Sequence, residues 1–294
     1  MVYTYQSSWP YYRIGDNALS VHRAHTIGNG SMRSCHLHDY YEIFYLVKGE
    51  RVFFIHDRIY TVRPGDLIVI LPHVLHRTGS SSKIQECERI LINFKAEFVE
   101  SEHWLPREDL TPFANGHCLI RFSKKEQSFI DHLIWEMLNE CREQRLGYED
   151  FLKSCLTQLL IRLRRQALHH ANGDAPAPRS HPLQEKISEI AAFITRNYAE
   201  EITLQMISEK FYISPYYLCR IFKQLTGFHF REYILFIRIK EAQKLLRESQ
   251  YKMIEIAHKV GFKHVAHFNT TFKKITKVTP LVYRKRHKVP PTFK

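Results

Sequence analysis

Basic side chains recur at a fixed spacing in the last third of the chain, and their chemistry suits a polyanion. Phe222-Lys223 matches Phe272-Lys273 fifty residues later, so one short unit is present twice. In each copy, two segments with helical apolar periodicity flank a tight break. This periodicity places Leu218 inside and the Arg220 side chain outside. The repeat therefore predicts two surface helices that carry cations.

The net charge of the chain is concentrated in the same region. The formal net charge is +13; residues 181–294 carry +12 of it, and residues 1–180 carry +1. A basic domain joined to a neutral one indicates that the C-terminal part alone meets a polyanion such as DNA. A basic surface that only aids solubility is the alternative.

Capping residues define the helices of residues 183–294. Ser214-Pro215 predicts a helix start, because serine accepts from free amides and proline suits the first helical position. Gly227 suits a left-handed helix end. We therefore expect two helix-turn-helix units, at 203–226 and 253–275, joined by a long unbroken helix.

Residues 42–94 show a different periodicity. Short alternating runs of β-branched and aromatic residues are separated by turn residues such as Pro64-Gly65-Asp66. They predict an antiparallel sandwich or small barrel within residues 1–110. Amphipathic helices follow in 111–168, where they could pack on the barrel or form a dimer contact, and 169–182 predicts an exposed linker.

The expected fold class is α+β with two domains. The N-terminal domain is an antiparallel β-barrel with a helical hairpin, and the C-terminal domain is an all-α double helix-turn-helix.

Within the predicted strands, residues are spaced as in the two motifs of the cupin superfamily: Gly30, His36-Leu37-His38, Glu42 and Gly49, then Pro64-Gly65-Asp66, Pro72 and His76. The resemblance implies a set of polar residues facing into the barrel, formed by His36, His38, Glu42 and His76. Three imidazoles and a carboxylate suit zinc, iron, manganese or nickel. Sensor cupins of transcription regulators keep such residues as a pocket for a small polar effector, which is what we expect here. No metal and no cofactor is expected, and His22, His25, His56 and His73 are expected on loops or the outer surface.

The last hundred residues are similar to the signature of the AraC family of bacterial transcription regulators. The matching motifs are S-P-x-Y-L-x-R-x-F-K, I-A-x-x-V-G-F, F-x-x-x-F-K-K, T-P and Y-R. A cupin, a helical pair and a linker before this region are also the usual order of that family. The resemblance implies that two recognition helices enter successive major-groove segments on one face of DNA.

The resemblance also assigns roles to exposed positions of both helices. The expected base contacts are Tyr216, Cys219, Arg220, His267, Asn269 and Thr270. The expected phosphate contacts are Lys223, Lys273, Lys274 and Lys277. The second helix has Asn269-Thr270 where the family commonly has an arginine, and Lys277 where a glycine usually ends the helix. We therefore expect the first helix to carry most of the base specificity.

The expected function is sequence-specific, DNA-binding transcription regulation, not enzymatic activity, in response to a sugar or sugar derivative bound in the barrel. The expected partners are double-stranded operator DNA, the small-molecule effector, RNA polymerase and a second copy of the chain. One alternative is a metal-dependent cupin enzyme, an isomerase or oxygenase, with an accessory DNA-binding domain. Another is a constitutive DNA-binding protein whose barrel only dimerises. Scattered cysteines, with no signal segment and no apolar run of bilayer length, predict a cytoplasmic protein without a membrane partner.

Overall fold

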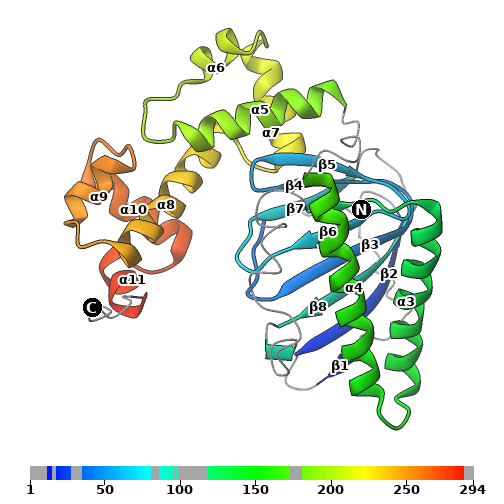
Figure 1. Cartoon of the computed structure of the whole chain (residues 1–294). Coiled ribbons are helices and arrows are strands. Elements are labelled where there is room, and N and C mark those ends of the chain that lie inside the picture. Colours follow the sequence, from blue (N-terminus) through cyan, green and yellow to red (C-terminus); the bar gives the residue numbers. More distant parts are fainter. Residues whose placement is uncertain are drawn as a thin grey trace. The chain divides into compact units, whose positions relative to one another are not determined.

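The computed structural model describes residues 12–14, 18–27, 35–80, 86–95, 97–98, 118–171 and 181–287 (Figure 1). The chain divides into two compact units, Met1–Gln184 and Glu185–Lys294. Most of the expected linker 169–182 lies outside the described residues, as does Gly30 of the first cupin motif.

The N-terminal unit is built from two antiparallel sheets. The larger sheet has the strand order β1-β2-β8-β3-β6-β9, and the smaller has the order β5-β4-β7. The strands are β1 (Tyr12–Ile14), β2 (Leu19–Ile27), β3 (Tyr41–Lys48), β4 (Arg51–Ile55), β5 (Arg58–Val62), β6 (Leu67–Ile70), β7 (His76–Ser80), β8 (Glu86–Phe94) and β9 (Leu119–Ile120). Turn residues end the strands where the sequence predicts; Gly49, for instance, has φ 94° and follows β3.

Strand β3 shows why the larger sheet is buried on both faces. Phe44 and Leu46 belong to the core cluster shared with the smaller sheet, and the Phe44 ring lies edge-on to Phe53 of β4, with centroids 4.8 Å apart. Ile43 and Tyr45 belong to the cluster that packs under two helices. Successive side chains of a strand point to opposite faces, so both clusters use one strand.

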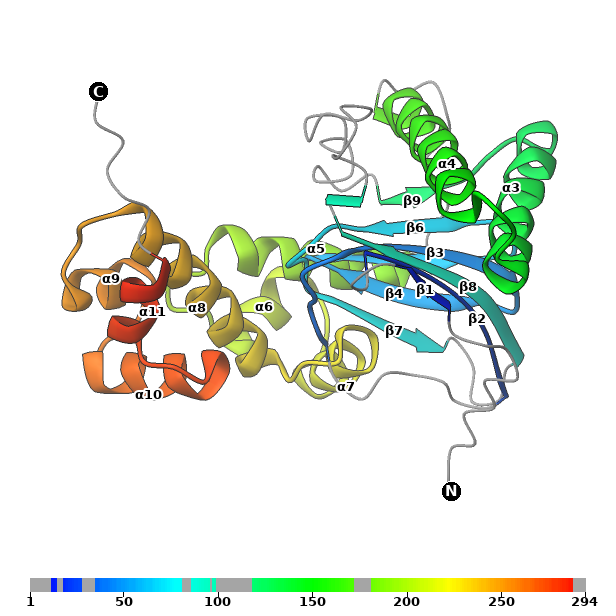
Figure 2. The same cartoon turned by 90° about the horizontal axis from the view of Figure 1, so that it is seen from below.

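Helices α3 (Lys124–Glu143) and α4 (Tyr148–Ala171) form a hairpin that covers this second face (Figure 2). A capping box of Ser123 and Glu126 begins α3, and Gly147, with φ 81°, lies in the turn between the helices. The Tyr45 hydroxyl donates a hydrogen bond to Asp131 of α3, which ties the helix to the sheet. The antiparallel barrel with a helical hairpin is confirmed.

Two parts of this unit differ from expectation. Strands β2 and β7 lie outside the segments that were predicted as strands from alternating apolar and polar residues. His22 was expected on a loop or the outer surface, and this was wrong: it lies on β2 with a relative exposure of 7%. The pairing of β2 with β8 and the cover of neighbouring elements bury it, and neither is visible in the local sequence.

The C-terminal region is entirely helical among its described residues. Its helices are α5 (Pro182–Arg196), α6 (Leu204–Lys210), α7 (Pro215–Thr226), α8 (Phe230–Glu248), α9 (Met253–Lys259), α10 (Val265–Thr276) and α11 (Pro280–His287). Helices α6 and α7 form one helix-turn-helix, α9 and α10 form the other, and the long α8 joins them. The double helix-turn-helix is confirmed.

The sequence repeat is also a repeat of contacts. Phe222 packs against Tyr233 with ring centroids 5.5 Å apart, and Phe272 packs against Tyr283 at 5.6 Å. Thr226 and Thr276 both donate their hydroxyl to the carbonyl four residues earlier, at 2.7 and 2.8 Å. Because equivalent contacts recur at a fixed offset of fifty residues, α7 and α10 are each held in place by an equivalent set of packing residues.

Candidate functional site

Local signals fix where α7 begins and ends. The Ser214 hydroxyl accepts the amide of Tyr217 at 3.4 Å, and Pro215 follows the cap at the first helical position. At the other end, Gly227 adopts φ 85° and donates its amide to the carbonyl of Lys223 at 2.8 Å. Because both ends are set, the face that α7 presents to solvent is also set.

That exposed face carries the side chains predicted for it: Tyr216, Cys219, Arg220 and Lys223. Tyr216 is 81% exposed. The Arg220 guanidinium lies 5.3 Å from the ring centroid of Tyr217, a cation–π contact that supports the side chain while leaving it exposed. Lys223 donates to the imidazole of His229 at 2.7 Å. A guanidinium on a supported, exposed stem can form the bidentate pair that guanine accepts.

The exposed face of α10 carries the second predicted set: His267, Asn269, Thr270, Lys273 and Lys274, with Lys277 just beyond the helix end. The N-cap His264 makes no side-chain capping bond, unlike Ser214 in the first unit. The Thr270 hydroxyl donates to the carbonyl of Ala266 at 3.0 Å, so its proton is already used within the helix. This face therefore offers mainly cations and imidazoles.

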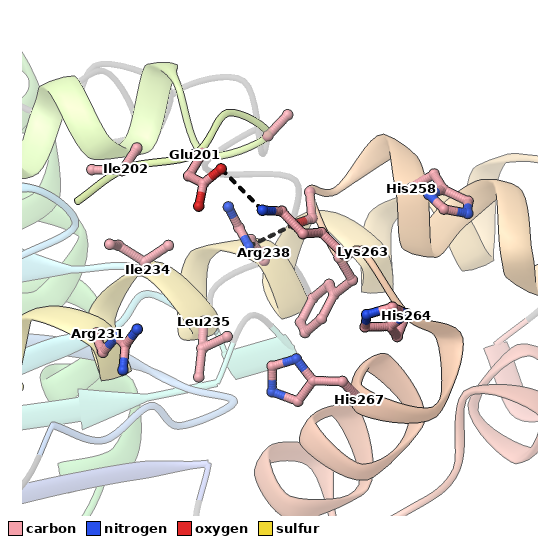
Figure 3. Close-up of a pocket in the computed structure, with 13 residues that line it drawn as sticks. Glu201, Ile202, Arg231, Ile234, Leu235, Arg238, His258, Lys263, His264 and His267 are labelled. Atoms are coloured by element: carbon pink, nitrogen blue, oxygen red, sulfur yellow. Dashed lines mark hydrogen bonds and ion pairs between the residues drawn. The ribbon is translucent and has the colours of Figure 1, made fainter.

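An open groove of about 660 Å³ lies within the C-terminal unit, beside α10 (Figure 3). Its charged and imidazole side chains are Glu201, Arg231, Arg238, His258, Lys263, His264 and His267. Lys263 pairs with Glu201 at 3.0 Å, although both side chains are largely exposed. Solvent weakens such a pair, so the single carboxylate of the groove offsets little of the charge of its three cations, Arg231, Arg238 and Lys263. The groove is therefore basic, and it shares His267 with the predicted base contacts of α10.

Arg238 of α8 holds the walls of this groove together. Its three guanidinium nitrogens donate to the backbone carbonyls of Tyr198, Gly261 and Glu200, at 2.8, 2.7 and 2.7 Å. Partial burial lowers the pKa of Arg238, but a guanidinium stays charged at neutral pH. We call these three bonds the Arg238 clamp. The clamp links the loop after α5 and the turn between α9 and α10 to the joining helix α8.

A second polar site lies in the N-terminal unit, where the residues of the cupin motifs come together. Backbone hydrogen bonds in both directions, at 3.0 and 3.1 Å, join His36 to His76 at the start of β7. The ring centroids of His36 and His38 lie 4.1 and 4.9 Å from that of His76. The carboxylate of Glu42 lies 3.5 Å from Nε2 of His38. We call these four residues the histidine cluster.

Burial disfavours the charged form of two imidazoles in this cluster. It lowers the pKa of His76 to about 4 and also lowers the pKa of His36. Burial raises the pKa of the adjacent Cys35 thiol to about 12, so this sulfur stays protonated. At neutral pH these two imidazoles are neutral beside one carboxylate. Neutral imidazoles can accept hydrogen bonds from hydroxyl groups or bind a metal ion.

Three basic residues of the groove, Arg231, Arg238 and Lys263, were not among the residues predicted from the sequence to contact DNA. A signal was available for two of them, since Arg231, Leu235 and Arg238 recur at i, i+4 and i+7 along α8. That spacing marks one helix face, and in the structure the face lines the groove.

Two family models match the chain. Residues 18–160 match the AraC-like ligand binding domain, and residues 207–286 match a helix-turn-helix domain. In the described ranges, no helix combines the length and the apolar character needed to cross a membrane.

Similar proteins align over most of the chain. The transcriptional activator RhaR of Cronobacter sakazakii is 26% identical over 85% of this chain and 86% of its own length. The uncharacterized regulator YbfI of Bacillus subtilis is 28% identical over 79% of this chain and 80% of its own. The C-terminal domain of AraT, a response regulator from Geobacillus stearothermophilus, is a solved structure that is 29% identical. This match covers 40% of the present chain and 95% of the AraT domain, with a TM-score of 0.37. The two domain matches in this order, together with the relatives that span both, show that the chain belongs to the AraC family of transcriptional regulators.

Proposed function

We propose that this regulator reads its operator mainly with α7, uses α10 chiefly as an anchor, and responds to a small polar effector held at the histidine cluster. The observation that carries the proposal is the difference between the two exposed helix faces. One face holds a supported arginine, while the other offers mainly lysines and imidazoles. The scaffolds beneath the two faces are matched, so the difference lies in what each face can recognise.

The length of α8 supports simultaneous binding of both helices. Nineteen residues separate the units along this helix, which at 1.5 Å per residue span roughly 28 Å. Two recognition helices on one face of B-DNA must be about one helical turn apart, or roughly 34 Å. The remaining distance of about 6 Å can be supplied if α7 and α10 lie somewhat beyond the two ends of α8.

Base contacts are proposed for the exposed residues of both helices: Tyr216, Cys219, Arg220, His267, Asn269 and Thr270. Arg220 is the principal one, because its donors match O6 and N7 of guanine. Phosphate contacts are proposed for Lys223, Lys273, Lys274 and Lys277, whose exposed ammonium groups would set affinity without reading sequence. Arg231 in the groove is a further candidate phosphate contact.

In the N-terminal unit we propose that the histidine cluster binds the polar groups of a sugar or sugar derivative. Hydroxyl groups can donate to neutral imidazoles and to the Glu42 carboxylate, which suits a polyol better than an anion. The effector would act by preferring one arrangement of the regulator over another. We propose activation of transcription in contact with RNA polymerase, in the cytoplasm, by analogy with the relatives that are named activators.

We also propose that the chain acts as a homodimer through the α3–α4 hairpin. Much of the hairpin's apolar surface packs on the sheet. Leu146 in its turn and Phe151 and Leu168 on α4 are nonetheless exposed, with fractions of 107%, 42% and 42%. A second copy would cover them.

The test of the DNA proposal compares Arg220→Ala with Lys244→Ala. Lys244 is exposed and lies nine residues after the groove residue Leu235, which places it roughly 180° around α8. The operator would be a duplex selected from a random library by the full chain. Arg220→Ala should weaken binding to it by about 1–3 kcal/mol, while binding to random duplex changes little. Lys244→Ala should change neither. If Arg220→Ala weakens both duplexes equally, Arg220 contacts phosphate and α7 does not read the sequence through it.

A further inference from the structure

We infer that two arginines on the inner face of the barrel, Arg51 and Arg89, bind an anionic group of a ligand, a carboxylate or a phosphate. The inference rests on the proposed function only in that the barrel is taken as the sensing part of the regulator. It narrows the proposed effector to an anionic sugar derivative, such as a sugar acid or a sugar phosphate. The arginines lie away from the histidine cluster, since Arg51 and the residue paired with His76 are at opposite ends of β4.

Strand register places both arginine side chains on the inner face. Arg51 alternates along β4 with Phe53 and Ile55, which belong to the core cluster between the two sheets. Arg89 pairs with Leu46 of β3, a member of the same cluster. Alternate residues of one strand share a face of the sheet, as do residues directly opposite each other on neighbouring strands. Two cations therefore face the apolar interior of the barrel.

Thr26 of β2 lies between the two arginines. Nη2 of Arg51 donates a hydrogen bond to the Thr26 hydroxyl at 3.1 Å. Thr26 pairs with Cys87, which makes Arg89 its diagonal neighbour on β8, at roughly 7–8 Å. Long side chains reach across that distance, so both guanidinium groups can contact one small ligand group.

The guanidinium of Arg51 is buried and incompletely bonded. Arg51 is 1% exposed, and its Nη1 has no hydrogen-bond partner among the described residues. An arginine does not lose its proton in a protein, so the charge persists inside the barrel. A buried charge is costly unless an opposite charge offsets it. Arg51 therefore requires an anion.

The two carboxylates of β8 do not supply this anion. Glu86 and Glu88 point to the opposite face of the sheet, because they alternate with the inward residues of the strand. Glu86 pairs there with Lys48, and Glu88 pairs with Arg23.

Glu42 shares the inner face but lies far along it. Glu42 pairs with Asn93, which is four residues from Arg89 on β8, or roughly 13 Å at 3.3 Å per residue. Its carboxylate lies beside His38 instead. Within the described ranges, no ion pair involves Arg51 or Arg89. The opposite charge must then come from outside the described residues, and a ligand can provide it.

The chemistry of the site selects carboxylates and phosphates. Both groups accept two parallel hydrogen bonds from a guanidinium. Arg89 is only half-buried, so solvent reaches this part of the inner face. Burial first, and the charge of Arg89 second, lower the pKa of His22 on the same face, which indicates a positive field there.

The first test needs no ligand. Arg51→Met removes the buried charge and keeps much of the volume, so the melting temperature of the ligand-free full chain should rise by at least about 2 °C. Arg63→Met is the control: it removes an arginine whose side chain is 62% exposed and should change the melting temperature little. A lower melting temperature in Arg51→Met would show that the chain itself pairs this charge and would overturn the inference.

The second test uses matched ligands at one ionic strength. The probes are D-gluconate with D-glucose, D-galacturonate with D-galactose, D-glucose 6-phosphate, and inorganic phosphate and acetate alone. We expect an anionic sugar to raise the melting temperature and to bind at least about tenfold more tightly than its neutral partner. Arg51→Met and Arg89→Met should lose this preference, and Arg63→Met should keep it.

The outcomes separate the carboxylate from the phosphate and the site from the sugar class. Stabilisation by inorganic phosphate or acetate alone, if lost in Arg51→Met, supports the anion site and refutes the sugar class. If no anion stabilises the natural chain more than Arg51→Met, the inference is wrong.

DNA binding is measured separately on the selected operator. Anion binding without operator binding would refute the proposed function and leave the anion site standing. The opposite result would refute only the anion site.

Discussion

Replacing Lys277 by glycine should stabilise the second helix-turn-helix and weaken its attraction to DNA. Lys277 follows α10 with φ 65°, in the left-handed region where the matching residue of the first unit is Gly227, with φ 85°. A residue with a β-carbon is disfavoured there by roughly 1–2 kcal/mol. Glycine loses about 0.5–1 kcal/mol more conformational entropy on folding, so the net gain is about 0.5–1 kcal/mol. The bond from the Lys277 ammonium to the Lys274 carbonyl is exposed and offsets little of this gain.

Hydrogen exchange of the full chain would measure the stability change. Amides in 265–287 should exchange about two to five times more slowly in Lys277→Gly, because a gain of 1 kcal/mol changes the open population about fivefold. If Lys277 contacts a phosphate, the slope of log affinity against log salt concentration should fall in magnitude by about 0.9. Stability and DNA affinity would thus move in opposite directions.

Two control variants separate the backbone effect from the charge. Lys277→Ala removes the ammonium but keeps the β-carbon, so the salt slope should fall while exchange is not slowed. Gly227→Ala introduces the strain into the first unit and should speed exchange in 215–226. The backbone argument fails if Lys277→Ala slows exchange as much as Lys277→Gly does. An unchanged salt slope in both variants would show that Lys277 does not contact the DNA backbone.

Three other perturbations have expected outcomes. Arg238→Met leaves three carbonyls without their donors and should lower the free energy of unfolding by about 2–4 kcal/mol in urea; Arg238→Lys should not restore it, because one ammonium cannot reproduce the planar guanidinium fork. Gly49→Ala would place a β-carbon 2.2 Å from the Glu86 carbonyl oxygen at φ 94°, so the melting temperature should fall, and an unchanged value would contradict the contact. Burial lowers the pKa of both His22 and His76 below 6.5, so the unfolded chain binds more protons below that pH. The protein should therefore be less stable at pH 5 than at pH 7.5 by thermal melting, and equal stability would argue against buried neutral imidazoles.

Features that short segments determine could be predicted from the sequence. The caps at Ser214-Pro215 and Gly227 use only residues next to the helix ends, and the structure places them as expected. The strand around Phe44 was recognisable because alternation and β-branched residues are local signals. The exposed faces of α7 and α10 followed from helical periodicity once the buried phenylalanines were identified.

Features that depend on distant residues could not be predicted in this way. The carbonyl partners of Arg238 lie between 23 and 40 residues away in sequence, on two separate loops, so nothing local distinguishes Arg238 from a solvated arginine. The spacing of the two cupin motifs identified the four residues of the histidine cluster in the sequence. Nδ1 of His38 is hydrogen-bonded to the carbonyl of Tyr40 and Nδ1 of His76 to the carbonyl of Val74, and the motif does not specify the loop geometry that places these carbonyls.

The Arg238 clamp bears on how an unequal pair of recognition helices could bind DNA. If α10 supplies mostly phosphate attraction, it adds affinity only while its position relative to α7 is fixed, because a tethered second contact depends on its effective concentration at the site. The clamp fixes the turn before α10 to the joining helix and to the loop before α6. Its loss should therefore weaken binding to a full operator more than binding to the half that α7 reads. If both fall equally in Arg238→Met, the two units do not depend on the clamp for their combined binding.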